Sequence, residues 1–256
     1  MLTMYLDESL EQNDGYAVVA GFIGNDESWN LCMRLWGESL ARHNRPSLHM
    51  KDLRWKRNRH TAMLADLGGI PSQCGLTLVY ASVKVSDYLD LIQGTLGEVI
   101  ASGYHLAMLM VLGYSMAVLP PEDRVEVICE QQDEFSGVRE SFLKLAFEME
   151  EWKTPGGLPR VAKWSAIPKS RILEPSDFAA YALLQALRDV KSKKTEMCAP
   201  ILLNPRTMGH CIGREEARIG VSGFIAQTKD GAIAQISSKA RAYVRRRFNA
   251  EYGGNI

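Results

Sequence analysis

Four acidic residues stand where predicted strands and helices begin or end. Asp7 and Glu8 close the first apolar run, Glu130 closes a later one, and Asp177 lies in the opening turn of a predicted helix. Carboxylates that converge at one edge of a sheet repel one another unless a cation lies between them, and their hard oxygen atoms suit Mg²⁺ or Mn²⁺. Two such ions about 3.5–4 Å apart can activate water and stabilise a leaving oxygen. These residue types therefore predict metal-dependent hydrolysis of a phosphodiester.

Each of these carboxylates also has a purely structural explanation. Asp7 and Glu8 can begin a turn, Glu130 can be a solvated strand end, and Asp177 can stabilise its helix through the macrodipole. The residues are far apart in the sequence, so only the fold can bring them together. Both interpretations, metal ligands and ordinary surface acids, are open at the level of the sequence.

His49 is a fifth candidate for chemistry, because it lies in a polar segment beside Lys51 and Asp52. An imidazole in such a setting can position a phosphate or transfer a proton during hydrolysis. The alternative is that His49 caps a turn or contacts a backbone carbonyl. The candidate catalytic residues are Asp7, Glu8, His49, Glu130 and Asp177.

Two local basic runs occur in a chain whose 30 basic and 30 acidic residues give a formal net charge of zero. The first run surrounds an aromatic residue, so its charges can neutralise phosphates while the ring stacks on a base. It consists of Arg54, Trp55, Lys56 and Arg57, and the second run consists of Arg245, Arg246 and Arg247 in a predicted helix over residues 236–250. A solvated face is the alternative explanation for each run.

Composition limits the class of protein. The chain has 256 residues, of which 46% are hydrophobic and 23% charged, which is ordinary for a globular protein and excludes disordered, collagen-like and coiled-coil classes. Its five cysteines are widely spaced without a C-x-x-C pair, so a disulfide framework or a zinc knuckle is not predicted. The sequence contains no glycine-rich phosphate-binding loop.

The sequence also sets expectations for cellular location. Asp7 and Glu8 stand where a secretion signal needs a basic flank followed by an apolar run. The longest weakly polar stretch, residues 106–119, is shorter than the ~20 residues of a membrane helix. We therefore expect a cytoplasmic protein that binds no membrane. From the basic runs and the acidic residues we expect nucleic acid as its partner, and the type of nucleic acid and the oligomeric state are open.

Hydrophobic patterning predicts the elements that position the candidate residues. Apolar runs at residues 2–6 and 16–23 predict a hairpin, and bulky residues at steps of three and four over 29–40 predict a helix. The later elements expected are a strand at 76–85, a helical region over 88–119, a strand at 125–129, a helix at 138–152, a strand at 160–167 and a helix at 174–190. This order predicts an α/β fold with a mixed sheet flanked by helices.

Four short segments follow one another in an informative order. They are MYLDES from Met4, LHMKDL from Leu48, VICEQ from Val127 and EPSDFAAYAL from Glu174. Together they resemble the domain-of-unknown-function 3800 family over residues 2–190. The resemblance implies a ribonuclease H-like fold with a metal-dependent nuclease site. It also implies that Asp7, Glu130 and Asp177 are the metal ligands, that Glu8 lies beside them, and that the cofactor is Mg²⁺ or Mn²⁺.

The predicted organisation is a ribonuclease H-like domain at residues 1–195 and a C-terminal extension at 196–256. We expect the extension to pack on the same domain and to end in the basic helix. The first functional hypothesis is a nuclease that hydrolyses phosphodiester bonds with a metal-activated water. The second hypothesis is a binding or regulatory module of the same fold that has lost catalysis.

Overall fold

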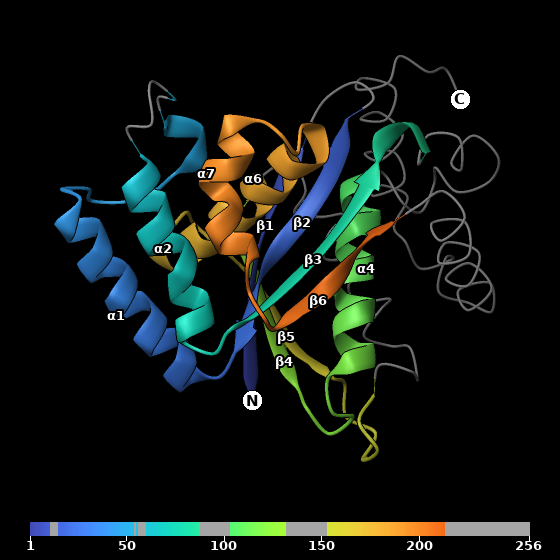
Figure 1. Cartoon of the computed structure of the whole chain (residues 1–256). Coiled ribbons are helices and arrows are strands. Elements are labelled where there is room, and N and C mark those ends of the chain that lie inside the picture. The colour runs from blue at the N-terminus through green and yellow to red at the C-terminus, as the bar shows by residue number, and fades with distance from the viewer. Residues whose placement is uncertain (11–14, 54, 56–59, 88–102, 132–152, 213–256) are drawn as a thin grey trace.

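A single mixed sheet of six strands forms the centre of the protein (Figure 1). The computed structural model describes residues 1–10, 15–53, 55, 60–87, 103–131 and 153–212. The strands are β1 (Leu2–Leu10), β2 (Tyr16–Gly24), β3 (Thr77–Lys84), β4 (Val125–Glu130), β5 (Val161–Ile167) and β6 (Thr207–Ile212). Their order across the sheet is β5-β4-β1-β2-β3-β6. Strand β2 is antiparallel to both of its neighbours, whereas β1 and β4, β4 and β5, and β3 and β6 pair in parallel.

Helices cover both faces of the sheet (Figure 1). One face is covered by α4 (Gly103–Val118), and the opposite face by α6 (Glu174–Arg188) with α1, α2 and α7 packed outside and beside it. The bounds of these last three helices are Asp26–Arg42 for α1, Thr61–Gln73 for α2 and Lys193–Leu202 for α7. Short 3₁₀ turns, η1 (Met50–Asp52) and η3 (Arg171–Leu173), lie in the connections. The α/β fold with a mixed sheet flanked by helices is therefore confirmed.

Strand alternation decides which residues of β1 meet which helical layer. Met4 and Leu6 belong to the hydrophobic core under α4, whereas Tyr5 packs against the core under α6. Because successive side chains point to opposite faces of a strand, Asp7 follows Tyr5 toward α6, and Glu8 follows Leu6 toward α4. The two adjacent acids thus lie on different faces of the sheet.

The sequence of helix α4 is apolar around almost its whole circumference, and the helix packs against one face of the sheet. Its buried residues include Tyr104, Leu106 and Leu112, which are fully inaccessible to solvent. The predicted helical region over 88–119 contains α4, and residues 88–102 lie outside the described part of the chain. No helix within the described ranges is long and apolar enough to cross a membrane.

Helix α2 is absent from the elements that the sequence predicts, because Gly68, Gly69 and Pro71 have low helix propensity. The structure shows that Gly68 serves helix packing instead. A methyl group at Gly68 would lie 2.7 Å from the backbone nitrogen of Ile201 and 2.7 Å from Cβ of Pro200, both in α7. The missing side chain lets α2 and α7 approach closely, so tertiary packing overrides the low helix propensity of glycine.

The predicted boundary after residue 195 falls within α7, which runs from Lys193 to Leu202. Beyond it, β6 pairs in parallel with β3 and extends the sheet at that edge. Residues 196–212 therefore continue the same layers as the residues before them. The predicted helices at 138–152 and 236–250 lie outside the described residues.

Two helical glycines give a matched test of the α2–α7 contact. We expect Gly68→Ala to destabilise the protein by about 1–3 kcal/mol, because the added methyl group meets the backbone of α7. Gly113→Ala in α4 should stabilise it by up to ~1 kcal/mol, since alanine favours the helix and its methyl group would have no heavy atom within 4 Å. Urea unfolding of both variants measures the difference, and equal effects would show that Gly68 has no packing role.

Candidate functional site

The first turn of α6 is fixed to β1 and to α1 by side-chain hydrogen bonds. Ser176 Oγ donates to the carbonyl oxygen of Tyr5 in β1 at 2.9 Å. Trp36 Nε1 in α1 donates to Glu174 Oε2 at 2.7 Å. Both Ser176 and Glu174 are buried. These contacts hold the start of α6 beside the end of β1, and so place Asp177 near Asp7.

Asp177 binds the segment that carries His49. The Nδ1 atom of His49 lies 2.7 Å from Asp177 Oδ2, and the backbone N–H of Met50 donates to the same oxygen at 3.0 Å. An ionised carboxylate only accepts hydrogen bonds, so Nδ1 is the donor when Asp177 is ionised. The side chains of His49 and Asp177 are only 21% and 14% exposed. The imidazole is therefore oriented as a histidine is when an aspartate supports it in acid–base catalysis.

Asp7 is the most deeply buried of the predicted metal ligands, with 5% of its surface exposed. The backbone N–H of Glu8 donates to Asp7 Oδ1 at 2.8 Å. Burial raises the pKa of the Asp7 carboxyl well above its usual range, and the negative charges of Glu8, Asp177 and Glu130 raise it further. The structure thus brings Asp7 within electrostatic reach of the three other predicted acids.

Glu130 and Glu8 take different positions around Asp7. Glu130 ends β4, and the register pairs the preceding Cys129 with Leu6, so Glu130 lies next to Asp7 along the sheet. Cys129 faces the core under α4, which puts Glu130 on the same face as Asp7 and α6. Glu8 is 9% exposed and lies on the α4 face, away from Asp177.

The donor atoms of this cluster suit a hard divalent cation, because they are carboxylate oxygens whose mutual repulsion a cation relieves. Although the types of donor atom suit such a cation, their positions do not form a ligand set. Over the ranges that the structure describes, no group of three or more His, Cys, Asp or Glu residues is placed so that it could hold a metal ion. Asp177 Oδ2 is instead engaged by His49 and Met50. Metal binding by Asp7, Glu130 and Asp177 therefore stays a prediction.

Glu174 is part of this site and was not predicted. It is 6% exposed, and burial raises the pKa of its carboxyl, an effect that the hydrogen bonds from Trp36 and from the backbone of Leu48 oppose. Leu48 and Met50 flank His49, so Glu174 and Asp177 hold this segment on both sides of the imidazole. Their spacing of three residues, which places two side chains on one helix face, was the available signal.

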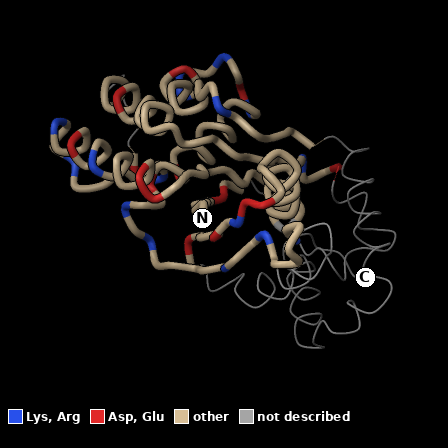
Figure 2. The backbone as a smooth tube through the Cα atoms, turned by 90° about the horizontal axis from the view of Figure 1, so that it is seen from below, with Lys and Arg blue, Asp and Glu red and all other residues tan. Residues whose placement is uncertain are grey.

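The predicted nucleic-acid-binding residues are described only at Trp55. Its ring stacks on Tyr181 of α6, with ring centroids 5.5 Å apart and planes at 5°, and Lys194 Nζ lies 5.6 Å from the ring centroid. Trp55 thus contributes to packing against α6 and α7. The other predicted residues, Arg54, Lys56, Arg57, Arg245, Arg246 and Arg247, lie outside the described residues. Basic and acidic positions are interspersed over the described helices and loops (Figure 2).

Comparison of the chain with protein-family models, curated proteins and solved structures gives no match.

Asp7→Asn should change how stability depends on pH. The native pKa of Asp7 is raised, so the folded state holds this proton more tightly than the unfolded chain, and unfolding free energy falls as pH rises from the ordinary value of 3.8 through the native pKa. Asparagine cannot ionise, so this part of the decline should disappear. At pH 7 we expect the metal-free variant to be more stable than wild type by about 0.5–2 kcal/mol.

Urea unfolding in EDTA at several pH values between about 4 and 8 measures this effect. Asp66→Asn is the matched control, because Asp66 is an aspartate whose side chain is 46% exposed and which pairs with His43 at the surface. Parallel pH profiles for wild type and Asp7→Asn would contradict the raised pKa.

Proposed function

We propose that the protein is a divalent-metal-dependent phosphodiesterase that acts on nucleic acid. The observation that carries the proposal is the buried carboxyl of Asp7, whose pKa is raised by burial and by the charges of Glu8, Asp177 and Glu130. A buried group with strongly perturbed ionisation beside specific charged partners is typical of functional sites. A cation at this position would convert the repulsion into binding energy.

The topology of the sheet supports a ribonuclease H-like assignment. The first five strands have the order β3-β2-β1-β4-β5, and among them β2 alone runs opposite to the others. This is the arrangement of the ribonuclease H-like fold that the sequence resemblance implies. Asp7 lies on the central strand β1, Glu130 on the neighbouring β4, and Asp177 on a helix packed against both β1 and β2. The fold is shared by proteins with different activities, so the site carries the functional argument.

The roles of the residues follow from their positions. Asp7, Glu130 and Asp177 would hold Mg²⁺ or Mn²⁺, which supplies charge neutralisation and an activated water when bound. His49 is held at Nδ1 by Asp177. Its Nε2 atom would exchange a proton with the attacking water or with the leaving oxygen, and Asp177 would stabilise the charged imidazolium. Glu174 would keep His49 in place through the backbone of Leu48.

A binding or regulatory module on the same fold is the second candidate. The specific observation in its favour is that, among the described residues, no three His, Cys, Asp or Glu side chains are placed so that they could hold a metal ion. Such a module would keep the Asp177–His49 contact for structure and would not respond to divalent metal.

Binding of Mn²⁺ separates the two candidates. A ligand that binds only the folded state stabilises it by about 2.7 kcal/mol at a concentration of 100 times its Kd. We expect Mn²⁺ to raise the Tm of wild type and of Asp66→Asn, and to have almost no effect on Asp7→Asn. Glu8→Gln should keep most of the Mn²⁺ response, because Glu8 lies on the other face of the sheet. Full Mn²⁺ stabilisation of Asp7→Asn would rule out Asp7 as a ligand.

His49→Ala tests the proton-transfer role. Loss of a general acid or base lowers turnover by about 10²–10⁴-fold, and we expect this loss without loss of Mn²⁺ stabilisation. His210→Ala is the control, because His210 lies in β6 at the edge of the sheet and its ring packs on Tyr114 of α4. Cleavage of labelled RNA and DNA strands in Mn²⁺ measures turnover. Equal activity of the two variants would show that His49 has only a structural role.

A further inference from the structure

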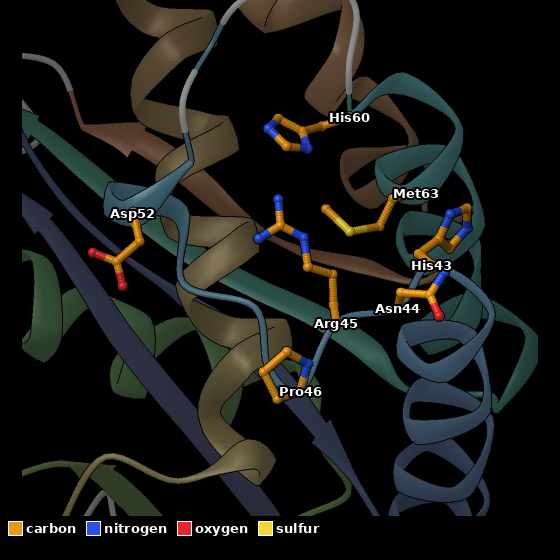
Figure 3. A pocket seen from close by; sticks show the side chains of 7 residues that line it. All are labelled: His43, Asn44, Arg45, Pro46, Asp52, His60 and Met63. Atoms are coloured by element: carbon orange, nitrogen blue, oxygen red, sulfur yellow. The ribbon is translucent and has the colours of Figure 1, made fainter.

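A pocket with a volume of about 540 Å³ lies between the end of α1, the segment before η1 and the start of α2 (Figure 3). This volume is in the range of ligand-binding pockets. The wall comprises polar side chains from the loop after α1, together with His60 and Met63 at the start of α2. None of the four acids of the carboxylate cluster, Asp7, Glu8, Glu130 and Asp177, lines it. The pocket is therefore a separate feature of the molecule.

Arg45 is a solvent-exposed residue on the wall of this pocket. Figure 3 shows its side chain extending across the pocket toward His60, with Met63 beside its stem. Asp52 is on the wall, but its carboxylate points away from the guanidinium (Figure 3). No ion pair joins Arg45 to an acidic residue in the part of the chain that the structure describes.

The two arginines of α1 differ from Arg45, which follows this helix, because each lies near a carboxylate. Arg34 Nη1 lies 3.0 Å from Glu38 Oε1, and Arg42 Nη2 lies 3.9 Å from Asp66 Oδ2. The guanidinium of Arg45 thus has no carboxylate partner among the described residues. A guanidinium presents its donors in a planar fork that matches the oxygen atoms of a phosphate.

We propose that this pocket binds a phosphate group of a nucleic-acid strand, with Arg45 as its principal ligand. The proposal rests on the proposed function and defines where the substrate is held outside the carboxylate cluster. His60 and Met63, both buried, form the wall of the pocket at the start of α2.

The chain connects this pocket directly to His49. Pro46 and Asp52 both line the pocket, and each is three residues from His49. Three residues span at most about 11 Å, so the pocket wall and the imidazole are close together. Arg171 Nη2 donates to the Pro46 carbonyl at 2.9 Å, which fixes this wall and adds a second positive charge behind it. Arg45 and His49 lie four residues apart on this segment, so in this proposal one bound strand contacts both side chains.

Binding of a fluorescein-labelled single-stranded oligonucleotide in EDTA tests the pocket without cleavage. We expect Arg45→Ala to weaken binding about tenfold or more, and to reduce the slope of log K against log salt by ~0.7, the value for one phosphate contact on a single strand. Arg45→Lys should keep the slope and recover only part of the affinity, because lysine keeps the charge and loses the fork. Arg42→Ala, which removes an arginine outside the pocket, should change affinity less than about twofold.

Equal losses in Arg42→Ala and Arg45→Ala would indicate general surface attraction and would overturn the pocket assignment, as would absence of binding by wild type. Displacement of the oligonucleotide by millimolar inorganic phosphate, but not by chloride of equal ionic strength, would overturn the assignment to a strand in favour of the free anion. The assay contains no metal, so its result is separate from that of the Mn²⁺ experiment. Binding that depends on Arg45 in a protein without Mn²⁺ response would retain the pocket and reject the phosphodiesterase.

Discussion

The hydrogen bonds of the first turn of α6 are the constraint on which the rest of the site depends. Ser176 ties this turn to the backbone of β1, Glu174 ties it to Trp36 and to the segment before His49, and Asp177 binds His49 and Met50. An unsatisfied buried polar group costs about 1–3 kcal/mol, so each of these contacts penalises displacement of the helix. The turn therefore has one position relative to the sheet. That position puts Asp177 beside Asp7.

The electrostatic state of Asp7 is a consequence of this packing. The hydrogen bonds that fix α6 also hold Asp177 near a carboxyl that is already buried and already adjacent to Glu8. Repulsion among these acids lowers stability at neutral pH, and it is not needed to build the sheet, whose core is apolar on both faces. A feature that opposes folding and has no packing role is characteristic of a site kept for binding.

The segment between α1 and α2 connects the two proposed binding features. Its backbone carries Arg45 at the pocket and His49 at the carboxylate cluster, and it is held by Arg171 at Pro46 and by the first turn of α6 at Leu48 and Met50. Because the same short segment bears both side chains, their separation is nearly fixed. A nucleic-acid strand would thus meet a preorganised pair of contacts, which reduces the entropy lost on binding.

The sequence by itself identified most of the strands and helices and singled out Asp7, His49 and Asp177, because periodicity, caps and residue chemistry are local properties. It placed Glu8 beside the predicted metal ligands, whereas the structure puts Glu8 on the opposite face of the sheet from Asp7. Only the tertiary structure decided that His49 binds Asp177, 128 positions away, and that Ser176 binds Tyr5, 171 positions away. It alone revealed Glu174, the Arg45 pocket and helix α2, whose Gly68 serves a contact with α7. These features depend on which distant groups meet, and the pairing is set by packing and by the need to satisfy buried polar groups rather than by local propensity.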